Sequence, residues 1–261
     1  MDVLINVLVY VIVFFLGASI GSFSLVVVRR GENKENGSWV TGKSVCESCK
    51  KELKWWELIP TVSFLALRGR CSKCKSKIDP SHFFCETAVG IAYTIIFYLY
   101  ASGRIGVIQL ALMFVTHAVL IALSFSDILY RTINVIPIYV LGGIGAIYNA
   151  ITSGKYYYIA IVVGLFVLSW FLCSKDCFAS FGAGDIDVGI CLFALTISGF
   201  AIFDIVFYAA IVGIVLSLTV LRKSERSVPF VPCLYFGYVL HSCGLSLTKL
   251  LYDFMTQILS M

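Results

Sequence analysis

The stretch that decides the fold is V3-LINVLVYVIVFFLGASIGSFSLVV-V28, which contains no Asp, Glu, Lys or Arg. An α-helix needs about 20 consecutive apolar residues to cross a bilayer, and this stretch exceeds that length. It has neither a basic segment in front of it nor a small-residue cleavage site behind it. We therefore interpret it as a retained membrane helix and not as a signal peptide.

Apolar runs of similar length recur along the rest of the 261 residues. The chain is 59% hydrophobic and only 13% charged, with a mean hydropathy of +0.93, which excludes a water-soluble globule. We predict an all-α polytopic membrane protein in contact with the lipid bilayer, with about eight transmembrane helices. The apolar runs after the first are 83–101, 106–126, 133–151, 157–173, 186–201, 203–221 and 229–259.

The orientation follows from the basic residues. Segment 29–82 holds 12 of the 20 Lys and Arg residues, and cytoplasmic loops carry an excess of these residues. This segment is therefore predicted to lie in the cytoplasm, with both chain termini outside. The net charge of +5 is explained by this topology, and no nucleic-acid partner is needed.

The same polar segment contains two C-x2-C pairs. Four thiolates at this spacing suit a tetrahedral Zn²⁺ ion, and a domain this small needs such a staple to fold. Two disulfides are the alternative, which a reducing cytoplasm disfavours. Because sulfur fills all four positions, the zinc would be structural. The predicted ligands are Cys46, Cys49, Cys71 and Cys74.

Two other features of the cysteine and aromatic content have plain interpretations. The remaining cysteines lie in or beside apolar runs and are expected to be small buried hydrophobic residues. Cys173 and Cys177 are four residues apart at a helix end, a spacing that is suggestive of a pair. Trp55 and Trp56 are typical of residues at a membrane–water interface. The more specific alternative is that they form a surface that contacts peptide or lipid.

Acids within apolar runs are rare and each is a candidate functional residue. Glu86 is expected at the start of the second span and Asp204 at the start of the seventh, where a helix N-terminus stabilises negative charge. Asp127 ends the third span and Asp185 begins the sixth, and both ends face the same side. These two carboxylates could therefore meet at one depth.

A close pair of carboxylates shares a proton, so one acts as base and the other as acid. Such a pair activates water against a peptide carbonyl without a metal or a covalent intermediate. Gly182 and Gly184 would leave room beside Asp185 for an extended substrate backbone. The alternative is that both acids are interfacial helix ends, which suits Asp185 but not Asp127, because a helix C-terminus disfavours negative charge.

Taken together, these residues resemble the type IV prepilin peptidase family. The resemblance runs from about residue 17 to residue 237, and the order of its motifs makes it specific. The motifs are G21-SF23 with Arg30, W55-WELIP60, L67-RGRC71, I78 to Glu86, Asp127, G182-AGD185 and V228-PFVPCL234.

The resemblance implies an aspartic endopeptidase in the cytoplasmic membrane of a bacterium, with Asp127 and Asp185 as the catalytic pair. It would remove a short basic leader from prepilin-like or pseudopilin-like proteins at the cytoplasmic face. Most members then methylate the new N-terminus using S-adenosylmethionine. The implied domains are a first transmembrane helix (1–28), a cytoplasmic zinc-binding domain (29–82) and a transmembrane peptidase domain (83–261), with Arg30 and Glu86 as auxiliary residues.

Three positions depart from the family pattern. Leu25 stands where relatives commonly have Asn, and Asp187 stands where they commonly have Lys. The Pro-Asn or Pro-Asp after the first catalytic Asp is reduced to Asn134, with Pro137 displaced. We expect Asp187 to point to a different side of its helix from Asp185, while remaining a possible auxiliary residue.

Two rival functions use the same residues. A proton-coupled transporter would place its acids near the bilayer midplane and show internal repeats, and no repeat is evident in the sequence. A non-enzymatic assembly factor would use the zinc domain as a docking module and would tolerate the loss of both aspartates.

Overall fold

The structure is a computed structural model of the whole chain. It describes residues 2–32, 43–174, 182–196, 201–219, 228–248, 250 and 255–257. Cys177 lies outside these residues, as does the side chain of Cys173, so their pairing stays a prediction.

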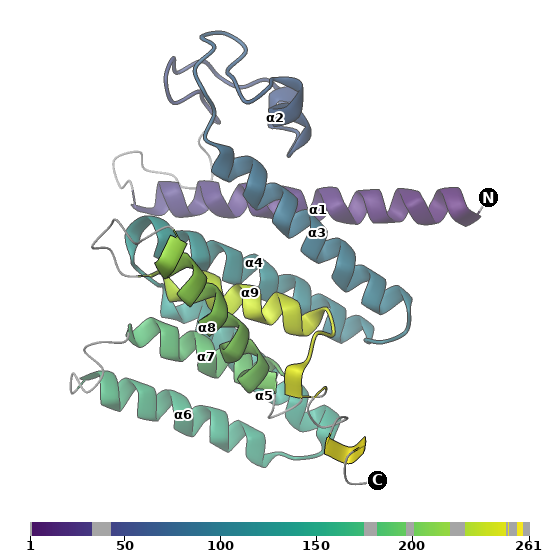
Figure 1. Cartoon of the computed structure of the whole chain (residues 1–261), viewed down its shortest axis with the longest axis vertical. Coiled ribbons are helices and arrows are strands. Elements are labelled where there is room, and N and C mark those ends of the chain that lie inside the picture. Colours follow the sequence, from purple (N-terminus) through teal and green to yellow (C-terminus); the bar gives the residue numbers. More distant parts are fainter. Residues whose placement is uncertain are drawn as a thin grey trace. The chain divides into compact units, whose positions relative to one another are not determined.

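The fold is built from α-helices, as expected, and the described residues contain no β-strand beyond two isolated bridges. Eight of the described helices have at least 13 residues and follow the eight apolar runs in order (Figure 1). They are α1 (Asp2–Glu32), α3 (Pro80–Ala101), α4 (Val107–Tyr130), α5 (Val135–Ser153), α6 (Tyr157–Ser174), α7 (Ala183–Leu195), α8 (Ala201–Thr219) and α9 (Phe230–Ser242). Two short helices, η2 (Trp55–Leu58) and α2 (Val62–Ala66), lie in the polar segment between α1 and α3.

Five of the described helices, α1, α3, α4, α5 and α8, are long and apolar enough to cross a membrane. The chain is thus a polytopic membrane protein with a cysteine-rich segment between its first two membrane helices. For two of the predicted apolar runs, the helix in the structure ends earlier than the run does. Run 229–259 is not one helix, because α9 ends at Ser242 and the chain turns through Gly244 with φ +86°. Helix α7 has 13 residues and ends at Leu195, well before the predicted position 201.

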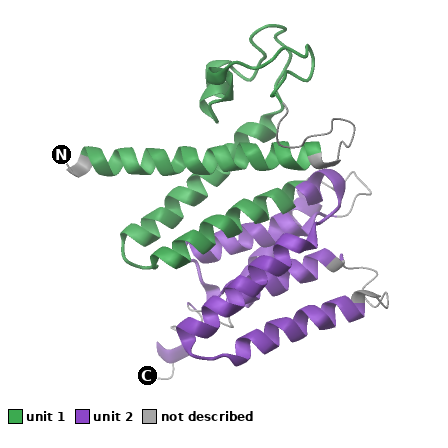
Figure 2. Cartoon of the chain, turned by 180° about the vertical axis from the view of Figure 1, so that it is seen from behind, with its two compact units in different colours: residues 1–125 green, residues 126–261 purple. Residues whose placement is uncertain are grey.

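The chain packs as two compact units, residues 1–125 and 126–261 (Figure 2). In the first unit α1 lies against α3, and the two backbones approach closely because glycines face the partner helix. A Cβ on Gly17 would lie 2.8 Å from the Tyr93 side chain, and one on Gly90 would lie 2.7 Å from Phe14. The domain boundaries predicted after residues 28 and 82 remain predictions.

In the second unit α5 packs against α7, and α8 packs against α9. A Cβ on Gly145 of α5 would lie 2.9 Å from the Ala194 carbonyl oxygen of α7. Asn149, one turn further along α5, donates from Nδ2 to the carbonyl oxygens of Ala194 (2.7 Å) and Thr196 (3.3 Å). Because these carbonyls stand at the C-terminal end of α7, the Asn149 amide caps that end.

Candidate functional site

The cysteine-rich segment forms two matching knuckles. In the first, Cys46 N–H donates to the Lys51 carbonyl (2.9 Å), and in the second Cys71 N–H donates to the Ser76 carbonyl (2.9 Å). The residue after each second cysteine, Lys50 or Lys75, has a positive φ of 55° or 59°. The two C-x2-C pairs therefore adopt the same local geometry.

The four sulfurs of these knuckles converge. The Sγ atoms of Cys46, Cys49, Cys71 and Cys74 all lie within 4.8 Å of one another, and those of Cys46 and Cys74 are 3.9 Å apart. All four thiols are free, so the disulfide alternative is not realised here. With zinc–sulfur bonds of about 2.3 Å, tetrahedral sulfurs stand slightly under 4 Å apart, so this set fits a zinc ion.

Backbone N–H groups near these sulfurs favour the thiolate form that binds a cation. The N–H groups of Cys49 and Ser48 lower the pKa of Cys46 to about 6. The Lys51 N–H acts in the same direction on Cys49, but desolvation and the neighbouring sulfurs outweigh it and raise the pKa of Cys49 to about 11. Thiolates this close repel one another, and a divalent cation at their centre would relieve that repulsion.

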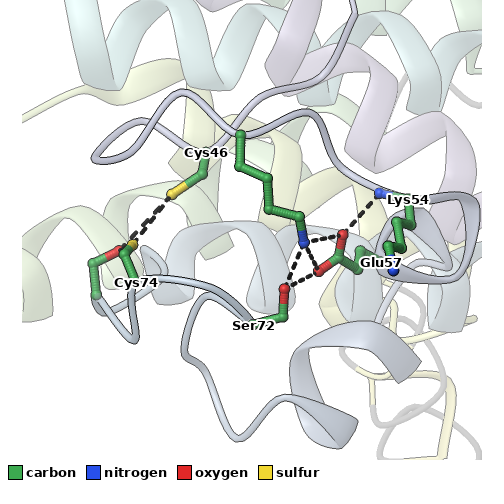
Figure 3. Close-up of polar contacts among 7 residues, drawn as sticks. Cys46, Lys54, Glu57, Ser72 and Cys74 are labelled. Carbon is green, nitrogen blue, oxygen red and sulfur yellow. Dashed lines mark hydrogen bonds and ion pairs between the residues drawn. The ribbon is translucent and has the colours of Figure 1, made fainter.

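A buried ion pair ties the two knuckles together (Figure 3). The Glu57 carboxylate accepts hydrogen bonds from Lys51 Nζ (2.8 and 2.9 Å), from the Lys54 backbone N–H (2.8 Å) and from the Ser72 hydroxyl. The Lys51 ammonium is the main cause that lowers the pKa of Glu57 to about 2. Sequence reasoning missed this network, although an acid inside the sequence W55-WE-L58 was a signal that one polar side chain there faces inward.

The predicted auxiliary residues of the first unit make specific contacts. Glu86 was expected at the start of its helix, which was wrong, because α3 already begins at Pro80 with Asp79 as its N-cap. Glu86 is buried and accepts a hydrogen bond from the Thr61 N–H at 2.6 Å. Arg30 donates to the Lys43 carbonyl (3.4 Å).

The neighbouring Arg29 is the more strongly paired of the two arginines. Its guanidinium contacts Glu47 at 2.9 Å and Asp79 at 2.8 Å, and so links the end of α1 to the first knuckle and to the start of α3. Nothing in the sequence distinguishes Arg29 from Arg30, so only the structure identifies it.

Asp127 and Asp185 both lie in the second unit, near enough to each other to interact electrostatically. Asp127 lies in the last turn of α4 and Asp185 in the first turn of α7. Their carboxyl groups lie within electrostatic reach of each other and of the Arg131 guanidinium. Asp127 is buried, and its Oδ2 accepts a hydrogen bond from the Val231 backbone N–H at 3.3 Å. The first turn of α9 therefore supports this carboxylate. Because the donor is a backbone N–H, the residue types in α9 give no sign of this contact.

The two glycines before Asp185 have different surroundings. A Cβ on Gly182 would lie 3.0 Å from Asp185 Oδ2, and Gly182 itself is exposed. A Cβ on Gly184 would lie 2.8 Å from Ile133 Cδ1. The space at a Gly182 Cβ is thus taken up by the Asp185 carboxylate, whereas the space at a Gly184 Cβ is filled by Ile133.

Asp187 points away from this cluster. Its carboxylate is buried and accepts hydrogen bonds from the Tyr139 hydroxyl of α5 (3.0 Å) and from the Ser169 hydroxyl of α6 (2.7 Å). This agrees with the expectation that Asp185 and Asp187 face different sides of α7. Asp187 therefore links three helices of the second unit.

Asp204 is also buried, but its partners are not those expected of a helix cap. Its carboxylate accepts hydrogen bonds from the Ser246 hydroxyl (2.7 Å) and from the Thr248 N–H (2.9 Å) and hydroxyl (3.0 Å). It therefore holds the start of α8 to the segment that follows α9.

Comparisons with known proteins agree with these features. Residues 15–100 match the family described as Bacterial Peptidase A24 N-terminal domain. The chain is 30% identical over 140 residues to a prepilin leader peptidase/N-methyltransferase of Vibrio cholerae. The aligned residues cover 51% of this chain and 55% of the relative. It is 32% identical over 113 residues to the protein of the same name from Klebsiella pneumoniae, covering 41% of this chain and 50% of the relative.

A third relative of that name, from Legionella pneumophila, is 38% identical over 87 residues, which cover 33% of this chain and 29% of the relative. No solved structure matches the chain. The chain spans about half the length of the first two of these relatives. With its cysteine tetrad between the first two membrane helices and these matches, the chain is similar over part of its length to the prepilin leader peptidase/N-methyltransferases.

Proposed function

We propose that this protein is an aspartic endopeptidase that removes the N-terminal leader of prepilin-like proteins at the cytoplasmic face of the membrane. The observation that supports the proposal is that Asp127 and Asp185, from two helices far apart in the sequence, lie within electrostatic reach of each other. The names of the relatives supply the substrate class, a prepilin leader.

In the proposed reaction the two carboxyl groups share one proton. The ionised carboxylate takes a proton from a water molecule, which attacks the carbonyl carbon of the scissile peptide bond. The protonated carboxyl group donates its proton as the amine leaves. The Val231 N–H would hold the Asp127 carboxylate in place, and Arg131 would limit the repulsion between the two acids.

The proposed approach for the substrate backbone is past Gly182, which is exposed and carries no side chain that would crowd Asp185. Any side chain at this position would be directed at Asp185 Oδ2. A peptide that enters as an extended strand needs such a gap, because its carbonyl must come within about 3 Å of the attacking water.

Zinc is proposed as the structural cofactor of the cysteine domain, held by Cys46, Cys49, Cys71 and Cys74. With four sulfur ligands the ion would stabilise the fold of this domain and take no part in the cleavage. Metal content of the purified protein should fall when Cys46 and Cys71 are both replaced by Ser, and stoichiometric zinc in that variant would contradict the assignment.

Methylation of the new N-terminus with S-adenosylmethionine is the second half of the proposal, and it rests on the names of the relatives. Leu25, which stands where relatives commonly have Asn, is buried. Mass spectrometry of a mature substrate produced with this protein would detect the added methyl group, and an unmodified amine would limit the protein to cleavage.

The decisive experiment is co-expression with a prepilin and measurement of leader removal. Asp127→Asn and Asp185→Asn keep the shape of each side chain but remove the acid, and each should slow cleavage by about a thousandfold or more. Asp204→Asn is the matched control, since Asp204 is another buried acid of the second unit with hydroxyl and N–H partners. It should accumulate and cleave like the wild type. Cleavage that survives either of the first two substitutions would refute the dyad.

A further inference from the structure

The cysteine domain presents an apolar face that its own fold does not use. Helices η2 and α2 expose Trp55 (78%), Leu65 (62%) and three further residues, Trp56, Leu58 and Val62. The one acid of η2, Glu57, is turned inward and paired with Lys51. Polar side chains inside and tryptophans outside are the reverse of the arrangement on a surface that faces water. We refer to these five exposed residues as the tryptophan face.

The tryptophan face lies at the level where a membrane helix begins. The Thr61 N–H, at the start of α2, donates to Glu86, which lies six residues into α3 and so about 9 Å along its axis. Phe64 of α2 stacks on Phe83 of α3 with ring centroids 5.1 Å apart. Helix α2 is therefore fixed beside the first two turns of a helix that is apolar enough to cross the bilayer.

The charge of the domain suits an anionic surface. Residues 43–78 contain nine Lys and Arg residues and three Glu residues. Each of the three acids is paired with a cation, Glu47 with Arg29, Glu52 with Lys43 and Glu57 with Lys51. Even with the two negative charges of a zinc ion bound by four thiolates, the domain remains positive. Lys54 and Arg68 immediately flank η2 and α2.

From these observations we infer that the tryptophan face docks on the anionic lipid surface of the membrane, with its aromatic rings among the lipid headgroups. Tryptophan prefers this zone because the ring is apolar and its N–H is polar, and nearby cations are attracted to anionic lipids. A basic leader peptide is the less suitable occupant, because the positive domain would repel it. The inference goes beyond the proposed function, and its test has no activity readout.

The test uses the full chain in nanodiscs that contain phosphatidylglycerol. Replacing Trp39, Trp56 and Trp170 with Phe leaves Trp55 as the single tryptophan. Lipid brominated near the headgroup end of its acyl chains should quench its emission by about half or more, and acrylamide should quench it weakly, as expected of an interfacial ring. Zinc content verifies that the domain is folded in each variant.

The matched control moves the tryptophan to the second knuckle of the same domain. In the single-tryptophan chain, Trp55→Phe with Lys73→Trp places the probe at an exposed residue outside the tryptophan face. This probe should resist brominated lipid and respond to acrylamide. Equal quenching of both probes by lipid, or a water-exposed Trp55, would overturn the inference. A Trp55 signal that changes only when a prepilin leader peptide is added would overturn it in favour of a peptide-binding surface.

Discussion

Gly237→Ala is expected to separate α8 from α9, the helix whose first turn supports Asp127. Gly237 lies in α9 where it meets α8, and a Cβ there would overlap the Ile205 carbonyl oxygen and lie 3.1 Å from the carbonyl carbon. These are backbone atoms, so no side chain can rotate away. Because ordinary contacts begin near 3.4 Å, the two helices must move apart by several tenths of an ångström or more.

The magnitude follows from two opposing effects. An extra methyl group in a closely packed contact costs about 1–3 kcal/mol, and this site is at the upper end because only backbone can yield. Alanine in a helix regains about 1 kcal/mol relative to glycine. The net loss in the free energy of unfolding should be about 2 kcal/mol. The movement should also lengthen the 3.3 Å hydrogen bond from Val231, six residues earlier in α9, to Asp127.

The assay is thermal unfolding in detergent followed with a thiol-reactive dye, which reports exposure of the buried cysteines Cys85, Cys191 and Cys233. The midpoint should fall by about 4 °C or more. Gly143→Ala on α5 is the control, since no described atom lies within 4 Å of a Cβ built there. It should keep or slightly raise the midpoint. A Gly237→Ala protein that unfolds with the wild type, or a control that falls equally, would refute the packing argument.

Three further predictions concern the site and the cysteine domain. Gly184→Ala should slow leader cleavage about tenfold, because the methyl group presses on the segment beside Asp185, while Gly189→Ala, which meets no described atom within 4 Å on the same helix, should leave the rate unchanged. Asp187→Leu should lower the free energy of unfolding by about 2 kcal/mol, since two buried hydroxyls lose their acceptor, and Asp187→Asn should restore part of it in the same thermal assay. Glu57, whose pKa is lowered to about 2 chiefly by Lys51, should contribute stability above its unfolded pKa of about 4.3 and lose it as the pH falls toward 2. The difference in unfolding midpoint between wild type and Glu57→Gln should therefore be constant from pH 7 to about 5 and shrink below about 4; a constant difference at all pH values would count against the ion pair.

Much of the fold could be predicted because its determinants are local. Apolar runs indicate membrane helices whatever their partners, and the C-x2-C spacing places two thiols on one turn. The start of α3 was missed although its signals were local, since Asp79 accepts from the Ser81 N–H and Pro80 occupies the first helical position. The end of α9 at Ser242 was not visible in hydropathy, because the turn through Gly244 lies inside an apolar run.

Only those parts of the candidate site that depend on the type of a side chain could be predicted from the sequence. The topology predicted from the sequence puts Asp127 and Asp185 at the same side of the membrane, and their chemistry makes each a candidate. The hydrogen bond to Asp127 comes from a backbone N–H 104 residues away, which carries no residue-type signal. Likewise the direction of Asp187 depends on Tyr139 and Ser169, two hydroxyls that are unremarkable in their own helices.

The length of α7 has a consequence for how water reaches a bond in a membrane. Thirteen helical residues rise about 20 Å, about 10 Å less than the thickness of the hydrocarbon layer of a bilayer. Under the proposed function α7 begins at the cytoplasmic face, so its C-terminal end would stop short of the opposite surface. Bare carbonyls are costly there, and the Asn149 amide donates to those of Ala194 and Thr196. Asp185, in the first turn of α7, would lie at the opposite end of the helix, where it meets the cytoplasmic water. The substrate's apolar helix could then stay in lipid while only its leader junction meets water.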